Sequence, residues 1–530
     1  MDSDKRRSLD NFHIKAGYQS REAAISCEVS LVEVHDVIHQ PDVYALVAFL
    51  AKKFNCSHVL DIGCGRGYEL SKLHPDFALV GVDFGSNIAY CRTHYPFVEW
   101  LELDLEQAHP ALLPKHVLSK TLIVCSDVIE HLCNPNGLLK TLENCLQYAP
   151  VAIVTTPERD LVRGYDDCGP PANHSHVREW SLSEFSKLLK EFSFNIAFLG
   201  LTFNNNRDFE KKSIMSIVHG LPIQHPKGRA PESFRVVAFM TIYNEEDIVL
   251  ESVNRLIRGG VEVYVIDNWS TDNSINLIEH LLGKGVIGIE QFPIGGATGT
   301  YDWRALLERV ETLSNQTVAD WFIHHDVDEI RESPWLETPL RDAIYHVDNL
   351  GFNAIDHTVI NFEPIDNSFQ SGSRLGTHFK YWSFGERPGH FQQIKAWKNL
   401  GQKISLAETG GHDASFTGRK VFPYKFLLRH YPVRSQFHGE KKILLERKLR
   451  FNAEERNILG WHTHYDEIQI SHNFLKQQNS LHNFDSNKFY KEYLVERISG
   501  IGIPRMQKNL TKKSILEKLA IYFHRLFKPL

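Results

Sequence analysis

The sequence predicts an α/β protein with two doubly wound domains in succession. Apolar strand-like runs alternate with helical runs from about residue 43 to 155, and a second alternation starts at residue 235. All eight cysteines precede residue 170, so the composition changes between the two halves. We therefore expect a first domain over residues 1–220, a linker over 221–232, a second domain over 233–495 and a tail over 496–530.

Composition and charge exclude several classes of protein. The net charge is −6, which gives no general attraction to nucleic acid. The polar N-terminus lacks the apolar core of a secretory signal, and no run approaches the roughly 18 apolar residues of a membrane span. No cysteines stand in CxxC spacing, so neither a zinc site nor a disulfide framework is indicated. We expect a cytoplasmic protein.

The first half contains five expected strands, and four of them end at an acid. A strand before the glycine-rich turn ends at Asp61, and strands over 78–82, 98–103 and 121–125 lead to Asp83, Asp104 and Asp127. The fifth runs over 150–155. Strands that alternate with helices form parallel sheets, whose ligands bind beyond the carboxyl ends of the strands. The four acids therefore indicate one binding edge.

The turn after the first strand has three glycines, Gly63, Gly65 and Gly67, and a helix follows it. Without a Cβ, glycine lets the backbone pass close to a ligand, and the free N–H groups of the helix face the same place. No lysine follows the glycines, so a P-loop is excluded.

The first half resembles the class I S-adenosylmethionine-dependent methyltransferases, which have a Rossmann-like fold. The resemblance rests on VLDIGCGRG at 59–67, GVDFG at 81–85, ELDLE at 102–106 and SDVIEHL at 126–132. It implies that the turn from Asp61 to Gly67 approaches the methionine part of S-adenosylmethionine. It also implies that Asp83 holds the ribose, that Asp104 and Leu105 flank the adenine, and that Asp127 lines the methyl-donor end.

Methyl transfer from a sulfonium needs an aligned nucleophile and, for a hydroxyl, a base. Glu130 and His131, which follow the fourth strand, are the base candidates there, and His176 lies in a segment that resembles the substrate side of sugar and small-molecule methyltransferases. Each histidine can equally be an ordinary structural residue.

The second half has expected strands over 236–242, 261–266, 286–291 and 321–325. The fourth leads into Asp326-Val327-Asp328, and residues i and i+2 of a strand share a face. We therefore expect two carboxylates on one side, which suits Mg²⁺ or Mn²⁺. The later chain, over about 350–430, is rich in aromatic residues and less regular, and residues 441–456 are expected to form a solvated charged helix.

The second half resembles the family 2 glycosyltransferases of the GT-A fold. The resemblance rests on the strand and turn over 239–246, VIDNWSTDNS at 265–274 and the DxD motif. It implies a nucleotide-sugar donor bound by Thr241, Asn244, Glu245, Asp267 and Asp272, and a divalent cation on Asp326 and Asp328. Transfer would proceed with inversion through a single displacement.

The catalytic base of the second half is expected in the loop Glu408–Asp413. Asp413 is the first candidate and Glu408 the second, and His412 and His430 can assist the metal or phosphate. No clear ED or QxxRW signature follows, so a processive polymer synthase is not indicated.

The leading hypothesis is a bifunctional enzyme that methylates and glycosylates one glycan or glycolipid. The alternatives are a glycosyltransferase whose first domain only binds a ligand, and a small-molecule methyltransferase whose second domain is inactive. The tail over 505–528 is basic and amphipathic, so it can either contact the inner face of an anionic membrane or dock on its own domain.

Overall fold

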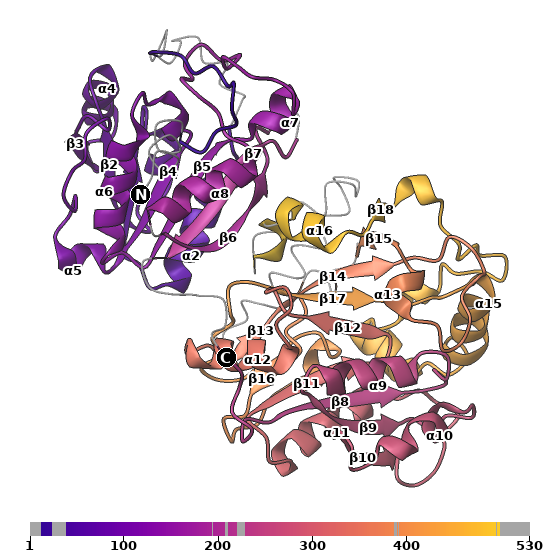
Figure 1. The fold of residues 1–530 in the computed structure, drawn as a ribbon. Coiled ribbons are helices and arrows are strands. Elements are labelled where there is room, and N and C mark those ends of the chain that lie inside the picture. Colours follow the sequence, from indigo (N-terminus) through magenta and orange to yellow (C-terminus); the bar gives the residue numbers. More distant parts are fainter. Residues whose placement is uncertain are drawn as a thin grey trace. The chain divides into compact units, whose positions relative to one another are not determined.

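The computed structural model describes residues 12–23, 39–192, 194–206, 210–219, 228–385, 390, 392–493 and 495–498. The chain divides into two compact units (Figure 1). Unit 1 comprises residues 1–225 and 487–495, and unit 2 comprises residues 226–486 and 496–530. Each unit has its own β-sheet structure.

Unit 1 is built on a seven-stranded sheet in the order β3-β2-β1-β4-β5-β7-β6. The first five strands are parallel, as the sequence predicts, and β7 and β6 extend the sheet with antiparallel pairing that it does not predict. The strands are β1 (His58–Ile62), β2 (Ala78–Asp83), β3 (Glu99–Glu102), β4 (Thr121–Ser126), β5 (Val151–Pro157), β6 (Asn195–Thr202) and β7 (Ser213–His219).

The helices of unit 1 cover a sheet whose central strands are buried along almost their whole length. This burial explains why β4 and β5 are continuous apolar runs. The helices are α2 (Val43–Lys53), α3 (Tyr68–Ser71), α4 (Ser86–His94), α5 (Lys115–Leu118), η1 (Ile129–His131), α6 (Pro135–Leu146), α7 (Arg159–Arg163), α8 (Leu182–Glu191) and α16 (Ser486–Glu492), whose first residue belongs to unit 2.

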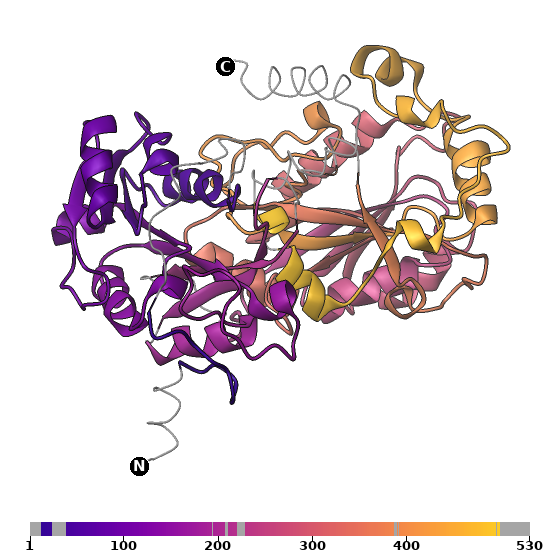
Figure 2. The ribbon, with the colours of Figure 1, turned by 90° about the horizontal axis from the view of Figure 1, so that it is seen from above.

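Unit 2 has a first sheet of six strands in the order β10-β9-β8-β11-β16-β13. Its four longest strands are parallel and match the predicted ones, whereas β16 and β13 are short and antiparallel. Figure 2 shows strands of this unit with helices on both sides. The strands are β8 (Val236–Ile242), β9 (Glu262–Asp267), β10 (Val286–Gln291), β11 (Trp321–Asp326), β13 (Ala354–Ile355) and β16 (Ala396–Lys398).

A second sheet of unit 2, in the order β12-β17-β14-β15-β18, is not predicted from the sequence. It forms from the aromatic-rich region that was expected to be irregular, and its strands pair residues far apart in the chain. The strands are β12 (Glu329–Glu332), β14 (His357–Phe362), β15 (Tyr381–Phe384), β17 (Phe426–His430) and β18 (His482–Asn483).

The DxD segment joins the two sheets of unit 2. Strand β11 ends at Asp326 and β12 begins at Glu329, so Val327 and Asp328 form a turn between them. The expectation that both carboxylates share a strand face is therefore wrong, because the strand does not extend to Asp328.

The remaining helices of unit 2 include two π-helical segments. The expected solvated helix over 441–456 is confirmed only in part, because η4 ends at Arg447 and buries Lys442 and Ile443, and η5 begins at Glu455. The helices are α9 (Val249–Arg258), α10 (Ser274–Ile278), η2 (Glu279–Leu281), α11 (Trp303–Gln316), α12 (Leu340–Asn349), α13 (Leu375–His378), η3 (Ala407–Thr409), α15 (Gln436–Gly439), η4 (Glu440–Arg447), η5 (Glu455–Leu459), η6 (Thr463–Tyr465), η7 (Gln478–Ser480) and η8 (Val495–Arg497), whose first residue belongs to unit 1.

In the described part of the chain, every helix is too short or too polar to cross a bilayer. The basic tail over 505–528 lies outside the described residues, so its expected membrane contact stays a prediction. The seven cysteines that the structure describes are free thiols, as expected.

Helix α8 begins with a capping box. The Ser181 hydroxyl accepts a hydrogen bond from the Glu184 amide, and the Glu184 carboxylate accepts one from the Ser181 amide. We expect Ser181→Ala to lower the free energy of unfolding of unit 1 by about 1 kcal/mol in urea titrations. Ser186→Ala is the matched control, since Ser186 lies within the same helix and takes no part in the capping box; an equal loss in both variants would contradict this assignment.

The buried His219 makes the stability of unit 1 depend on pH. Burial lowers the pKa of His219 to about 4, although the hydrogen bond to the Pro150 carbonyl raises it in part. Below pH 6.5 the unfolded chain therefore binds a proton at His219 that the folded chain does not bind. The free energy of unfolding falls as the pH is lowered from 6.5 toward 4, by up to about 3 kcal/mol. Urea titrations from pH 4 to 7.5 should show a flatter profile for His219→Gln than for the wild type. An unchanged profile would show that His219 does not contribute.

Candidate functional site

The glycine turn of unit 1 lies between β1 and α3. Gly63, Gly65 and Gly67 all have positive φ angles, of 81°, 54° and 68°, which favour glycine. A Cβ on Gly63 would lie 2.3 Å from Val128 Cγ2, and one on Gly67 would lie 2.4 Å from Trp100. A Cβ on Gly65 would meet no atom within 4 Å. Gly63 and Gly67 thus permit packing within the protein, and only Gly65 faces open space.

Asp83 ties the turn to the end of β2. Its carboxylate accepts hydrogen bonds from the Gly65 amide at 2.8 Å, the Phe84 amide at 2.8 Å and Asn87 Nδ2 at 3.1 Å. A carboxylate has about four acceptor positions, so capacity remains for a ligand hydroxyl. The structure therefore brings Asp83 to the glycine turn, as the sequence predicts for one site.

Asp61 has an unsatisfied oxygen next to this turn. Tyr44 donates to its Oδ2 at 2.7 Å, but its buried Oδ1 has no partner among the described residues. Burial raises the pKa of Asp61 to about 7. A buried acceptor without a donor is costly, so this oxygen suits a ligand that carries an ammonium group.

Asp104 and Leu105 follow β3 at the same edge of the sheet. The Asp104 carboxylate accepts from the Glu106 amide at 3.0 Å and from Gln107 Nε2 at 3.1 Å, and Leu105 is buried. Asp104 therefore stabilises its own turn, and its role toward an adenine stays a prediction.

A cluster of acids and histidines follows β4. Asp127 has a positive φ of 53° and accepts a short hydrogen bond from Gln40. Helix η1 places Glu130 and His131, and the loop before α8 supplies His176. One ligand atom each of Glu130, His131 and His176 lies within 4.8 Å of the other two. The three base candidates are thus brought together, with burial raising the pKa of both Asp127 and Glu130 to about 7.

The N-terminal segment over 12–23 holds the loop that carries His176. Arg21 donates to the backbone carbonyls of Asn173 at 2.9 Å and His176 at 2.8 Å. Glu179 accepts from His176 Nδ1 at 2.6 Å. The sequence did not indicate these positioning roles of Arg21 and Glu179, because both contacts depend on a loop geometry without a motif.

In unit 2, the turns after β8 and β9 are joined by side-chain hydrogen bonds. The Asn244 side chain accepts from the Thr271 amide at 2.7 Å, and Asp272 accepts from the Glu246 amide at 3.1 Å and the Ser274 hydroxyl at 2.6 Å. Asp267 accepts from the Ser270 amide at 3.0 Å. Three predicted donor-binding residues, Asn244, Asp267 and Asp272, thus shape one pair of turns.

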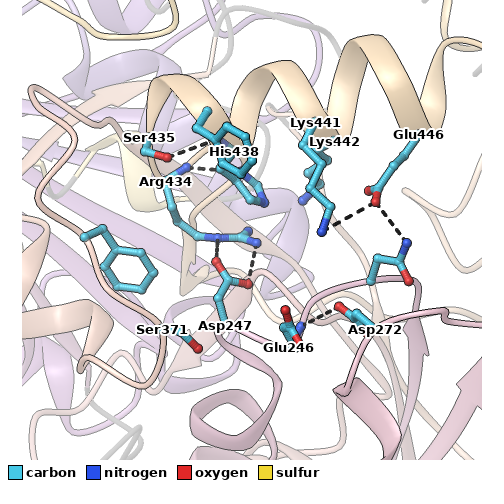
Figure 3. Close-up of a pocket in the computed structure, with 13 residues that line it drawn as sticks. Glu246, Asp247, Asp272, Ser371, Arg434, Ser435, His438, Lys441, Lys442 and Glu446 are labelled. Atoms are coloured by element: carbon cyan, nitrogen blue, oxygen red, sulfur yellow. Dashed lines mark hydrogen bonds and ion pairs between the residues drawn. The ribbon is translucent and has the colours of Figure 1, made fainter.

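A polar pocket opens beside these turns, and Figure 3 shows its lining. Asn244, Glu246 and Asp272 line it from the turns, and Arg434, Lys441 and Lys442 line it from the segment over 434–446. The pocket is therefore lined by both signs of charge, with these three cations and four carboxylates, which are Glu246, Asp247, Asp272 and Glu446. The sequence did not indicate the cations, which lie about 190 residues further along the chain.

Glu245 is buried and contacts these cations instead of opening toward the pocket. Lys442 Nζ lies 2.6 Å from the Glu245 carboxylate, and Arg434 forms a short ion pair with the same carboxylate. Arg434 also donates two hydrogen bonds, each of 2.8 Å, to the carboxylate of Asp247. The prediction that Glu245 binds a ligand gains no geometric support, because these internal cations engage its carboxylate.

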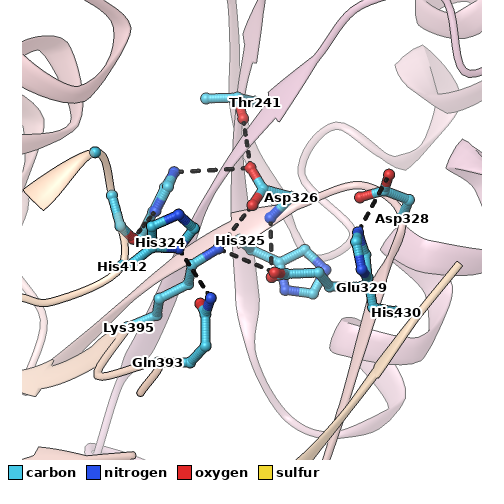
Figure 4. A network of polar contacts seen from close by, with 12 residues as sticks. Thr241, His324, His325, Asp326, Asp328, Glu329, Gln393, Lys395, His412 and His430 are labelled. Atoms are coloured by element: carbon cyan, nitrogen blue, oxygen red, sulfur yellow. Dashed lines mark hydrogen bonds and ion pairs between the residues drawn. The ribbon is translucent and has the colours of Figure 1, made fainter. Parts of the chain in front are cut away.

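Each DxD carboxylate is paired with a buried lysine, and Figure 4 shows the pair of Asp326 with Lys395. Lys395 Nζ lies 2.7 Å from Asp326 Oδ2, and Lys442 Nζ lies 2.8 Å from Asp328 Oδ2. Burial alone would raise the pKa of each aspartate, but the lysine charges outweigh it and hold both below their usual range. Thr241 donates to Asp326 Oδ1 at 3.3 Å, which joins a third predicted residue to this network.

His430 lies beside the DxD segment, as predicted for a ligand. Its Nε2 is 3.8 Å from Asp328 Oδ2, and its Nδ1 is 2.9 Å from Asn361 Oδ1. Burial lowers the pKa of His430, which keeps the imidazole neutral and able to coordinate a cation.

The two base candidates of unit 2 are engaged elsewhere in the described contacts. Arg419 forms a short ion pair with Asp413, whose other oxygen accepts from Gln392 at 3.2 Å. Glu408 is exposed and pairs with Arg304 at 2.8 Å. His412 instead bonds Gln393 at 2.8 Å within the network of Figure 4. The structure thus joins His412, and neither carboxylate, to the group that contains Asp326.

Comparison with known proteins identifies part of unit 1. A family model described as "Methyltransferase domain" matches residues 36–197. A probable S-adenosylmethionine-dependent methyltransferase of Mycolicibacterium smegmatis is 30% identical over 165 residues, 31% of this chain and 58% of that protein. A protein of the same description from Mycobacterium tuberculosis is 29% identical over 170 residues, 32% of this chain and 57% of its own.

Solved structures also match this region. An S-adenosylmethionine-dependent methyltransferase from Mesorhizobium loti is 14% identical, with a TM-score of 0.27, and the match covers 33% of this chain and 96% of that one. The chain spans a little more than half the length of the curated relatives that it matches. Residues 36–197 therefore form a methyltransferase domain, and the methyltransferase prediction for this region is confirmed.

Substitutions at the glycine turn should separate packing from ligand binding. Gly63→Ala places its Cβ against Val128, so we expect a large loss of thermal stability. Gly65→Ala has room and adds only backbone strain, of roughly 1–2 kcal/mol. Calorimetric titration with S-adenosylmethionine, the ligand that the motif implies, should show at least tenfold weaker binding for a folded Gly65→Ala protein. Undiminished affinity would contradict a cofactor above Gly65.

Proposed function

We propose that the protein is a bifunctional transferase of glycan or glycolipid biosynthesis. Unit 1 transfers a methyl group from S-adenosylmethionine to a sugar hydroxyl, and unit 2 transfers a sugar from a nucleotide-sugar donor with inversion. The observation that carries the proposal is that each unit gathers carboxylates where its parallel strands end. Unit 1 does so at Asp61 and Asp83, and unit 2 does so at Asp326 and Asp328.

S-adenosylmethionine suits the site of unit 1 because it carries two positive groups, a sulfonium and an ammonium. The unsatisfied Asp61 Oδ1 can accept from the ammonium, and Asp83 retains acceptor capacity for the ribose hydroxyls. The names of the methyltransferase relatives support the same cofactor. The acceptor hydroxyl then needs only alignment with the methyl carbon and loss of its proton.

A nucleotide diphosphate suits the pocket of unit 2. Arg434, Lys441 and Lys442 are each paired with a carboxylate and still have N–H groups that can donate to phosphate oxygens. Asn244 and Asp272 supply polar groups for a nucleoside. For unit 2 we therefore propose a GT-A fold and the activity of a family 2 glycosyltransferase.

The DxD segment is compatible with the divalent cation of this proposal. Lys395 and Lys442 each bind Oδ2 of one aspartate, and Oδ1 of Asp326 accepts a hydrogen bond from Thr241 at 3.3 Å. A carboxylate oxygen has two lone pairs, so each Oδ1 can still act as a hard oxygen ligand, with His430 adjacent. Bound there, Mn²⁺ or Mg²⁺ would neutralise the diphosphate leaving group. Lys442 links this segment to the pocket, because it lines the pocket and contacts Asp328.

The assignment is tested by separating the two activities in full-length protein. Glycans from a deletion strain complemented with each variant are analysed by mass spectrometry. Asp83→Ala should remove a methyl group and spare the sugar, and Asp326→Ala should remove the sugar that unit 2 adds. Asp76→Asn and Asp466→Asn are matched controls, since both carboxylates form ion pairs, with Lys52 and Arg456, that involve none of the candidate site residues.

Two outcomes would favour the alternatives. Loss of the sugar alone in every active-site variant would indicate a glycosyltransferase whose unit 1 only binds a ligand. Loss of the methyl group alone would indicate a methyltransferase with an inactive unit 2. Simultaneous loss of both activities in folded Asp326→Ala protein would contradict two independent sites.

A further inference from the structure

Glu130, His131 and His176 form a group of three potential metal ligands in unit 1. One ligand atom of each lies within 4.8 Å of the other two. Glu130 and His131 are adjacent in η1, while His176 comes from the loop over 173–180 that Arg21 holds in place. The group is therefore assembled from two separate segments and fixed by contacts outside it.

Both imidazoles are oriented by an acceptor on Nδ1. His131 Nδ1 lies 2.8 Å from the Ser175 carbonyl, and His176 Nδ1 lies 2.6 Å from Glu179 Oε1. Acceptors at these positions fix the Nδ1–H tautomer and leave the lone pair on Nε2. Asn173 Nδ2 lies 2.9 Å from His176 Nε2 and donates to this lone pair, so a cation bound there would replace the Asn173 hydrogen bond. Histidine ligands of metals are commonly oriented by such a second hydrogen bond.

The Glu130 carboxylate is fully buried, and only one of its two oxygens accepts a hydrogen bond in the described contacts. Thr156 donates to Oε2 at 3.0 Å, whereas Oε1 has no partner among the described residues. Glu179 Oε2, next to His176, also has none. Buried carboxylate oxygens without donors are costly unless a cation or a proton compensates them.

A second group of three potential ligands, in unit 2, differs from this one because cationic side chains already pair with its carboxylates. Glu245, Asp247 and His438 also bring three ligand atoms together, but Arg434 contacts both carboxylates and Lys442 contacts Glu245. That group already contains its cations. In the described contacts, no lysine or arginine pairs with Glu130.

We propose that Glu130, His131 and His176 bind one divalent cation, of the Mn²⁺ or Zn²⁺ type, that also binds the hydroxyl of the methyl acceptor. One carboxylate and two imidazoles suit first-row transition cations, and three protein ligands leave coordination positions open for a substrate oxygen. This role in catalysis rests on the proposed methyltransferase function of unit 1.

The cation would make the acceptor hydroxyl more acidic. The acceptor O–H bond breaks and its proton leaves to water. The oxygen forms a bond to the methyl carbon, and the C–S bond breaks, with its electron pair returning to sulfur. S-adenosylhomocysteine and a methyl ether result. His131 and His176 therefore serve as ligands in this account, and not as the bases that the sequence suggests.

Mn²⁺ binding to the full-length, chelator-treated protein tests the site without any acceptor. Electron paramagnetic resonance measures free Mn²⁺, and spin-echo modulation detects ¹⁴N from bound imidazole. In protein that carries Asp326→Asn/Asp328→Asn we expect one nitrogen-ligated Mn²⁺, with affinity at least tenfold lower when Glu130→Gln or His176→Ala is added. The double variant Asp326→Asn/Asp328→Asn is the control, because it removes the expected oxygen ligands of unit 2.

The outcomes separate this inference from the proposed function. Nitrogen-ligated Mn²⁺ that persists when Glu130→Gln or His176→Ala is added to the Asp326/Asp328 control, or that is absent from this control, would overturn it. Unchanged S-adenosylmethionine affinity shows that the Glu130 and His176 variants remain folded. A failed methyl-transfer assay with normal Mn²⁺ binding would count against the proposed function and not against the cation site.

Discussion

The contact of Lys442 with both Glu245 and Asp328 is central to unit 2. It brings a residue of η4 to the turn after β8 and to the turn after β11, at 2.6 Å and 2.8 Å. Each of these carboxylates would be unstable as a buried anion without a cation nearby. Lys395 likewise forms ion pairs with both Asp326 and Glu329. Buried acids at the ends of parallel strands therefore determine how the later chain folds back.

Unit 1 meets the same constraint differently. Asp61 and Glu130 each keep a buried oxygen without a partner in the described residues, and burial raises their pKa values to about 7. A site with unsatisfied acids favours a positively charged ligand, which gives one physical reason for a sulfonium cofactor in unit 1. In unit 2 the buried acids are neutralised by Lys395, Lys442 and Arg434, so a diphosphate would depend on the divalent cation proposed for the DxD segment.

The sequence predicts the parallel strands well because they are buried apolar runs that end in acids. It does not predict the second sheet of unit 2, whose short strands pair residues such as Glu329 and His430 across a hundred positions. Lys442 reads as part of a solvated charged run, since nothing local indicates partners at Glu245 and Asp328. Likewise, the glycine spacing predicts the turn, but the contacts of Gly63 with Val128 and of Gly67 with Trp100 depend on the fold.

The central claim is that one chain holds two independent sites, one for S-adenosylmethionine and one for a nucleotide diphosphate. Calorimetric titration of full-length protein with S-adenosylmethionine, and then with UDP and Mn²⁺, tests it most directly. The account predicts one site for each ligand, with Asp83→Ala weakening only the first and Asp326→Ala only the second. Silence from either ligand with wild-type protein, or loss of both in one folded variant, would contradict it.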